Sequence, residues 1–298
     1  MKKIFAAKIL LLFMGIFSLF FAGCGGNADK EEEKNNAKLD SARATLFQVG
    51  DELFSIPSPV QTAVLIKKIG ANYDKEMLND AKKAATYSTR VQRALNLGVY
   101  GADLAYITMY DQTQEAISHL NASRKIADEL GVSSAFDEAL LQRFQANLGK
   151  KDSLLVLVAE AYRSSDSYLK NNERDDVGSL ILAGGWIEAL YFATKVAQST
   201  NNPDVNRRIG EQKNTLENLI KLLQKYNNNE EFADIVTELI NLYSLFDEVE
   251  YVYAFEKPTT DANKKLTMVN SKSDVKISKE QLEAINGKIA EIRNIIIG

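Results

Sequence analysis

Apolar residues recur at spacings of three and four along most of the chain, which is the period of an amphipathic helix. The 298 residues include only four prolines, and glycines follow several of the apolar-periodic stretches, as expected for helices joined by short turns. The fold class predicted is therefore all-α, an antiparallel helix-hairpin bundle. The expected helices cover residues 38–49, 59–69, 75–97, 101–110, 113–130, 134–148, 151–171, 175–199, 203–226, 229–254 and 279–296.

Capping signals mark the start of two of these helices. Asn202 followed by Pro203 is the N-cap and first-turn pattern of a helix. Ser278 with Gln281 three residues later is a capping-box pattern, and it opens the C-terminal helix 279–296. That helix carries one apolar stripe and is expected to dock on the body through Leu282, Ile285, Ile289, Ile292 and Ile296.

The predicted helix 175–199 is apolar almost all round between Val177 and Ile187, so it is expected at the centre of the bundle. A membrane span is the rival interpretation, and the charge of Glu188 within the helix argues against it. Adjacent glycines, Gly184 and Gly185, predict the close approach of a neighbouring backbone or of a ligand.

Residues 98–131 resemble the helix pair of a tetratricopeptide repeat. With Ala116 at the small-residue position of the repeat, Tyr100 falls where the first helix carries its aromatic residue. Asp103 and Leu104 depart from the repeat pattern, and no second copy follows at a step of about 34 residues. A TPR-like solenoid in part of the chain stays open.

The polar stretch 256–278, which contains Pro258, is predicted to be a loop. A small hairpin is the alternative, with residues 266–269 and 275–277 as strands around a turn at 270–274.

The N-terminus has the pattern of a signal peptide. Three lysines precede the apolar run Ile9–Ala22, and its 14 residues fall short of the roughly 20 that span a bilayer. The run ends in Phe21-Ala22-Gly23-Cys24, which resembles the lipobox of bacterial lipoproteins. That resemblance implies cleavage before Cys24 and attachment of acyl chains such as palmitate to it.

The expected organisation is a lipoprotein signal peptide at 1–23, a flexible acidic tether at 24–37 and a single all-helical domain at 38–298. An acidic run soon after the cysteine resembles the surface-export signal of some Gram-negative lipoproteins. Gly25 in place of aspartate after the cysteine also fits the outer membrane. The predicted location is the outer membrane, facing the periplasm or the cell exterior.

Composition excludes several classes of function. Cys24 and His119 are the only cysteine and histidine, so no metal site and no cofactor is expected. The formal net charge is −4, and loss of the signal peptide with its three lysines leaves 33 basic against 40 acidic residues. An acidic body disfavours nucleic acid as a partner and leaves membrane attachment to the lipid anchor.

Two carboxylates lie within unusually apolar stretches of the sequence. Asp103 and Glu188 each need a buried partner such as a tyrosine hydroxyl or an arginine, which is a structural interpretation. The functional alternative is a ligand pocket lined by Tyr100, Asp103, Tyr106, Trp186, Glu188 and Tyr191. His119 lies one helical turn after Glu115, which predicts a surface or half-buried pairing rather than a catalytic or metal site.

Three segments together resemble a group of uncharacterised helical envelope lipoproteins of Gram-negative bacteria. These segments are 56–59, 100–106 and 184–191. The resemblance implies architecture alone. The first function hypothesis is a non-catalytic lipoprotein that binds or scaffolds an envelope protein, and the second is a lipoprotein that binds a small molecule or glycan. A carboxylate-based hydrolase ranks third.

Replacement of Cys24 by serine tests the lipid anchor. Because the hydroxyl of serine does not replace the acylated thiol, Cys24→Ser is expected to abolish fatty-acid labelling and to release the protein from membranes or leave it unprocessed. Metabolic labelling with a fatty-acid analogue, followed by fractionation, measures both effects. Continued labelling of Cys24→Ser would contradict the assignment.

Overall fold

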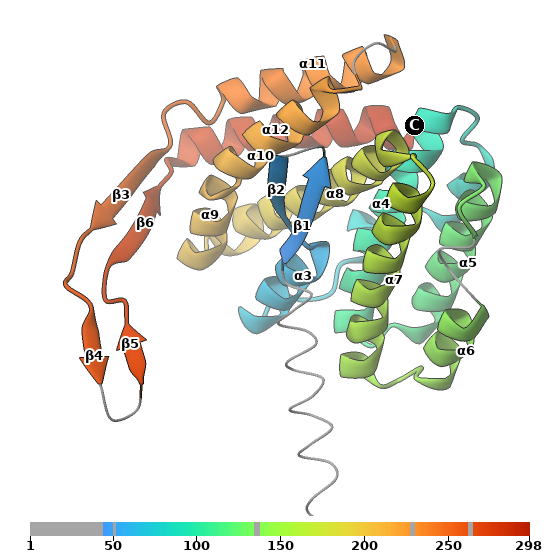
Figure 1. Ribbon diagram of the computed structural model, residues 1–298, viewed down its shortest axis with the longest axis horizontal. Coiled ribbons are helices and arrows are strands. Elements are labelled where there is room, and N and C mark those ends of the chain that lie inside the picture. The colour runs from blue at the N-terminus through green and yellow to red at the C-terminus, as the bar shows by residue number, and fades with distance from the viewer. Residues whose placement is uncertain (1–43, 50–51, 134–137, 227–229, 262–264) are drawn as a thin grey trace, which may run out of the picture. The chain divides into compact units, whose positions relative to one another are not determined.

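The amphipathic pattern produces a mostly helical body, shown in Figure 1. This computed structural model describes residues 44–49, 52–133, 138–226, 230–261 and 265–298, and Ser41–Gly298 is one compact unit. Cys24, the predicted signal peptide 1–23 and the predicted tether 24–37 lie outside the described residues. The helices are α3 Pro59–Lys68, α4 Arg90–Met109, α5 Thr113–Leu130, α6 Glu138–Ala146, α7 Lys151–Asn171, α8 Asp175–Thr200, α9 Pro203–Gly210, α10 Gln212–Gln224, α11 Glu230–Ser244 and α12 Lys279–Ile297.

Two short 3-10 helices, η1 Lys75–Met77 and η2 Ala81–Ala85, precede α4. The strands form three two-stranded antiparallel sheets. Their bounds are β1 Ala44–Val49, β2 Glu52–Pro57, β3 Glu250–Ala254, β4 Thr259–Asp261, β5 Leu266–Met268 and β6 Lys272–Lys276, with β1 paired to β2, β3 to β6 and β4 to β5.

The predicted caps are confirmed. The side chain of Asn202 accepts a hydrogen bond from the backbone N–H of Asp204 (2.9 Å) and starts α9, with Pro203 in its first turn. Ser278 and Gln281 form the reciprocal capping box that starts α12. Gly131 ends α5 in the left-handed conformation, with φ of 68°.

Helices α4 and α8 pack most closely on one another and form the centre of the body. At their N-terminal ends Arg90 on α4 pairs with Asp176 on α8 (2.9 Å). Further along, the rings of Tyr106 and Phe192 lie 4.9 Å apart. Because the contacting residues increase in number along both helices, α4 and α8 run parallel. The predicted bundle of antiparallel pairs did not include a parallel central pair.

Glycine allows the two central backbones to touch. A Cβ atom at Gly98 would overlap the carbonyl of Ile181 and approach the backbone nitrogen of Gly185. A Cβ atom at Gly184 would overlap the carbonyl of Leu95. The close approach predicted for the glycine pair of α8 is therefore an approach of the α4 backbone.

Gly98 explains one error of the sequence analysis. The predicted helices 75–97 and 101–110 are wrong, because η1 and η2 occupy the first part and α4 runs without interruption through Gly98. The helix begins instead at the capping box of Thr89 and Gln92. A glycine that ends a helix and a glycine at a helix crossing give the same local signal.

Three other predicted helices differ from the structure. Residues 44–49 form strand β1, and residues 38–43 of that predicted helix lie outside the described ones. The helix 203–226 divides at Glu211 into α9 and α10. The helix 229–254 ends at Ser244, and its last five residues form β3 because Tyr251, Val252 and Tyr253 favour extended backbone.

The central position predicted for α8 is confirmed. Within the described part of the chain, α8 is the one helix long and apolar enough to cross a bilayer, and 94% of its most apolar window is buried in the protein. Helices α3, α4, α7, α9, α10 and α12 all contact it. Helix α12 docks through Ile285, Ile289, Ile292 and Ile296, which are buried as expected, whereas Leu282 is only half-buried.

The region predicted to be a polar loop is a long β-hairpin that projects from the helices (Figure 1). Strand β3 pairs with β6, with Val252 opposite Asp274, and β4 pairs with β5, with Thr260 opposite Thr267. The small hairpin left open in the sequence analysis is wrong in its register, because both of its expected strands lie on the returning limb. We call residues 250–261 and 265–276 the arm.

The glycine crossing gives a test of the fold. Gly98→Ala and Gly184→Ala are each expected to lower the free energy of unfolding by about 1–3 kcal/mol or more, because the added methyl group meets rigid backbone. Gly287→Ala on α12 is the matched control. Its Cβ would meet nothing within 4 Å, so it is expected to stabilise the protein by up to about 1 kcal/mol. Chemical denaturation measures all three, and equal effects at the three positions would contradict the crossing.

Candidate functional site

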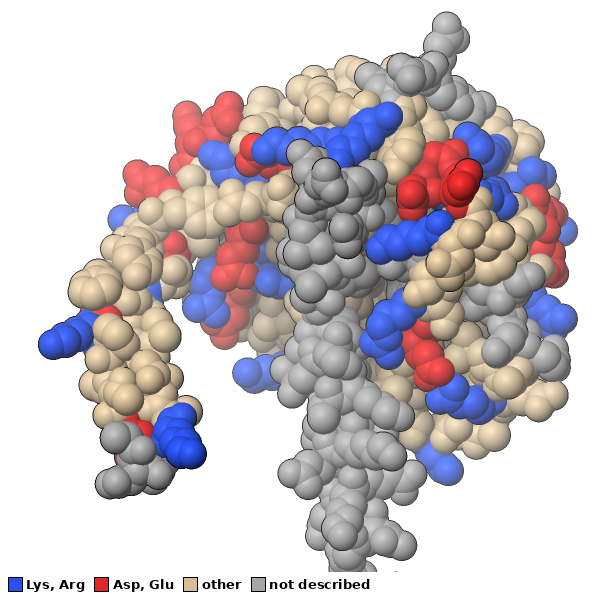
Figure 2. Space-filling view, in the orientation of Figure 1, with Lys and Arg blue, Asp and Glu red and all other residues tan. Residues whose placement is uncertain are grey.

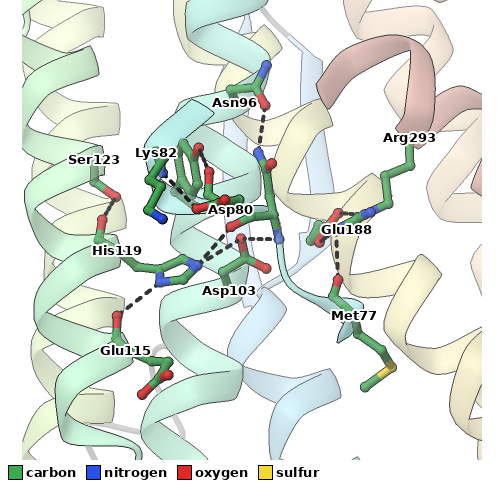
Figure 3. Close-up of polar contacts among 12 residues, drawn as sticks. Met77, Asp80, Lys82, Asn96, Asp103, Glu115, His119, Ser123, Glu188 and Arg293 are labelled. Atoms are coloured by element: carbon green, nitrogen blue, oxygen red, sulfur yellow. Dashed lines mark hydrogen bonds and ion pairs between the residues drawn. The ribbon is translucent and has the colours of Figure 1, made fainter. Parts of the chain in front are cut away.

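The parallel packing of α4 and α8 brings the two carboxylates of the sequence analysis together. Asp103 on α4 and Glu188 on α8 are both fully buried and close enough to share a hydrogen bond. Figure 3 shows them with the residues around them. We call the buried group formed by Asn79, Asp103, His119, Glu188 and Arg293 the polar cluster.

Arg293, from α12, neutralises Glu188. Its Nε donates to one carboxylate oxygen (2.6 Å) and its Nη2 to the other (2.8 Å), so the ion pair is bidentate. Nη2 also donates to the backbone carbonyl of Met77 (2.7 Å), and the guanidinium lies 4.3 Å from the ring centre of Tyr191. The ion pair therefore joins α12, α8 and the η1 segment in the interior.

Among the described residues, no lysine or arginine forms an ion pair with Asp103, and His119 lies 3.7 Å from it. Burial, followed by the negative charge of Glu188, raises the pKa of the Asp103 carboxyl well above its usual range, and Arg293 opposes the rise. Burial also raises the pKa of Glu188, but Arg293 bonds to both of its oxygens. We therefore assign the proton to Asp103, which then donates a hydrogen bond to the ionised Glu188 and leaves the cluster neutral.

Asn79 holds the other side of Asp103. Its backbone N–H donates to Asp103 Oδ2 (3.3 Å), and its amide nitrogen donates to the hydroxyl of Tyr87 (2.9 Å) and to Asn96 Oδ1 (3.1 Å). Asn96 donates in turn to the carbonyl of Ile296 (2.8 Å). The segment before α4 and the end of α12 are thus bonded to the same buried group.

His119, from α5, completes the cluster. Its Nε2 lies 3.0 Å from the carbonyl oxygen of Asn79 and 3.7 Å from Asp103 Oδ2, and its Nδ1 lies 2.9 Å from the carbonyl of Glu115. Burial lowers the pKa of the imidazole, so the ring is neutral at pH 7 and its tautomer decides which carbonyl accepts its single N–H. The Glu115 carboxylate pairs instead with Lys75 (2.5 Å).

Two of the three tyrosines of the predicted pocket bond to backbone. Tyr100 donates from its hydroxyl to the carbonyl of Asp80 (2.8 Å), and the hydroxyl of Tyr106 accepts from the N–H of Asp74 (2.9 Å). Tyr73 stacks on Tyr106 with ring centres 5.5 Å apart. These contacts fasten the segment between α3 and α4 over the cluster.

Trp186 lies apart from the other five residues of the predicted pocket. Its indole N–H donates to Gln212 Oε1 (3.0 Å) on α10. With Pro57, Thr62 and Arg208 it lines a recess with room for about one water molecule, about 10 Å³. The structure therefore brings Tyr100, Asp103, Tyr106, Glu188 and Tyr191 around the polar cluster and leaves Trp186 on another face of α8.

The sequence pattern did not indicate Arg293 or Asn79 as site residues, and it did not predict the burial of His119. Arg293 stands among the isoleucines of the α12 stripe, beside Ile292, and a charge at such a position was the available signal. Asn79 precedes a 3-10 turn and gave no periodic signal. Over the described ranges, no group of three or more His, Cys, Asp or Glu residues is placed to hold a metal ion.

The arrangement favours the structural interpretation of the two carboxylates. A protonated carboxyl beside an ionised one is an arrangement that acid–base catalysis uses. Asp103 and Glu188 are 0% exposed, however, so a substrate does not reach them. Their oxygens are directed at protein groups from α5, α12 and the η1 segment (Figure 3).

The exposed surface of the arm is a second candidate site. Tyr251, Tyr253 and Phe255 alternate along one limb, and Tyr253 and Phe255 are 65% and 72% exposed. Val269 on the returning limb is 78% exposed. In Figure 2 the arm is mostly uncharged between a few lysine and acidic side chains. Several large apolar side chains this exposed on one two-stranded arm are unusual in a soluble domain.

The root of the arm is fastened to the body. The Tyr251 hydroxyl donates to the carbonyl of Gly210 at the end of α9 (3.0 Å). A methyl carbon of Val275 lies 2.5 Å from where a Cβ of Gly210 would stand, so the absent side chain admits the strand. The arm is therefore held in place at one end and open beyond it.

Comparison of the chain with protein-family models, with curated proteins and with solved structures finds no match in any of the three.

The buried ion pair gives a prediction for stability. Arg293→Met is expected to cost about 3–5 kcal/mol at pH 7, because it leaves a buried carboxylate without a cation. The joint replacement of Glu188 by leucine and Arg293 by methionine removes both charges and is expected to cost far less. Arg143→Met, at the exposed pair with Glu160, is the control and should cost at most about 1 kcal/mol.

The cost of Arg293→Met should depend on pH. Without the cation, the pKa of Glu188 in the folded state rises further above its ordinary value of 4.5, so the folded state binds more protons than the unfolded state. The loss of stability is therefore smallest near pH 4 and grows as the pH rises. Urea denaturation at several pH values measures it, and a loss that is independent of pH would contradict the assignment.

Proposed function

We propose that this protein is a lipid-anchored lipoprotein of the cell envelope that binds another protein, and that the arm is its binding element. The observation that carries the proposal is the exposed apolar surface of the arm, on a hairpin fastened at its root. The lipobox-like segment ending at Cys24 supports the anchor and an outer-membrane location. No catalytic role is part of the proposal.

The helical body supports this function as a scaffold. Its candidate polar site is filled by its own side chains, and the recess at Trp186 has room for about one water molecule, so neither favours a small-molecule or glycan ligand. The antiparallel pair α4–α5, joined by Arg93 and Glu129 (2.9 Å), supports the hairpin bundle proposed for the finer architecture. A TPR-like part remains a proposal.

Site-specific photocrosslinking in intact envelopes tests the proposal. A photoreactive phenylalanine at position 255 is expected to give protein adducts, because Phe255 lies on the open part of the arm. The same group at Ile295 is the control, since that side chain is also apolar and 62% exposed but lies on α12. Adducts at both positions alike, or with lipid only at 255, would contradict the proposal.

A further inference from the structure

The two edges of the arm differ in chemistry. Among the described residues, β3 pairs only with β6, so each strand keeps one edge without a strand partner. An unpaired edge offers N–H and C=O groups to a further strand, and a two-stranded ribbon alone is marginally stable in water.

The β6 edge is protected against pairing with itself. Lys272, Asp274 and Lys276 alternate along it. An antiparallel partner of the same sequence, centred on Asp274, would place two aspartates opposite each other and Lys272 opposite Lys276. Like charges directly opposite are unfavourable, and α9 lies beside this strand.

The β3 edge has the opposite character. Its sequence is Glu-Tyr-Val-Tyr-Ala, symmetrical in its aromatic positions about Val252. An antiparallel copy centred there places Tyr251 opposite Tyr253 of the second copy and Glu250 opposite Ala254. No like charges meet, and aromatic cross-strand pairs are among the favourable ones. Tyrosine and valine also favour extended backbone.

We propose that the β3 edge of the arm pairs with β3 of a second copy of this chain, in antiparallel register about Val252. The result is a four-stranded sheet in the order β6, β3, β3, β6, with a two-fold axis at its centre. A two-fold interface uses the same patch on both subunits. The symmetry of the strand about Val252 therefore points to a second copy of this chain as the partner. This inference rests on the proposed function and names the partner.

The four-stranded sheet also gives the exposed tyrosines of β3 aromatic neighbours from the second copy. Residues 251 and 253 lie on the same face of the strand, so the two copies gather four tyrosines on one face of the sheet.

A cysteine at the two-fold axis tests the register. Opposed residues of antiparallel strands have Cα atoms about 4.5–5.5 Å apart, within disulfide range. Val252→Cys in the full-length chain in native membranes is expected to give a disulfide-linked dimer on mild oxidation. Asp274→Cys is the matched control and should stay monomeric. The unaltered chain controls for Cys24, its only natural thiol.

The mass of the full-length chain in detergent gives the second measurement. Light scattering is expected to show a dimer for the natural sequence, at least tenfold weaker dimerisation for Val252→Lys, and an unchanged dimer for Asp274→Lys. Circular dichroism checks that each variant is folded. A monomeric natural chain, or a Val252→Lys dimer of natural strength, would overturn the inference.

The crosslinking outcomes separate the inference from the proposed function. An adduct between Phe255 and a different protein, without a Val252→Cys dimer, overturns self-pairing and leaves a protein-binding arm. An adduct of two copies together with the disulfide supports both. The absence of any protein adduct at position 255 removes the proposed function and the inference together.

Discussion

The packing of the helical body depends on the buried ion pair between Glu188 and Arg293. Removing both charges from water costs several kcal/mol per ion, so the pair is tolerated because its geometry is bidentate and Arg293 also donates to the carbonyl of Met77. A second buried carboxyl at Asp103 would add an unbalanced charge, which is why it keeps its proton. Through Met77 and Asn79 the same cluster fixes the irregular segment that covers α4.

The strongest helical periodicity could be read correctly from the sequence. Helices α3, α5, α7, α8 and α12 begin and end within two residues of the predictions, because each combines a clear apolar pattern with caps or breakers at its ends. Gly98 was misread, since only the position of a distant backbone distinguishes a helix crossing from a helix end. The partner of Glu188 was also out of reach, because Arg293 lies 105 residues away in the chain.

The structure separates a closed body from an open arm. In the body, the buried groups of the polar cluster face one another, and the residues expected to line a pocket instead bind backbone or protein side chains. The arm does the reverse, because Tyr253 on β3 and Phe255 just after β3 are exposed to solvent with no core beneath them. The exposed side chains of the arm are not buried within one chain, but contact with another chain would bury them. Their exposure therefore indicates a role in binding.

Native-state hydrogen exchange of the full-length chain tests this separation most directly. If the polar cluster is a closed structural element, the slowest amides lie in α4 and α8 around Asp103 and Glu188, with exchange that requires global unfolding. The amides of β4 and β5 in the arm should exchange many times faster. Exchange around Asp103 and Glu188 as fast as in β4 and β5 would contradict the account, because it would mean that the cluster opens to solvent as a functional site does.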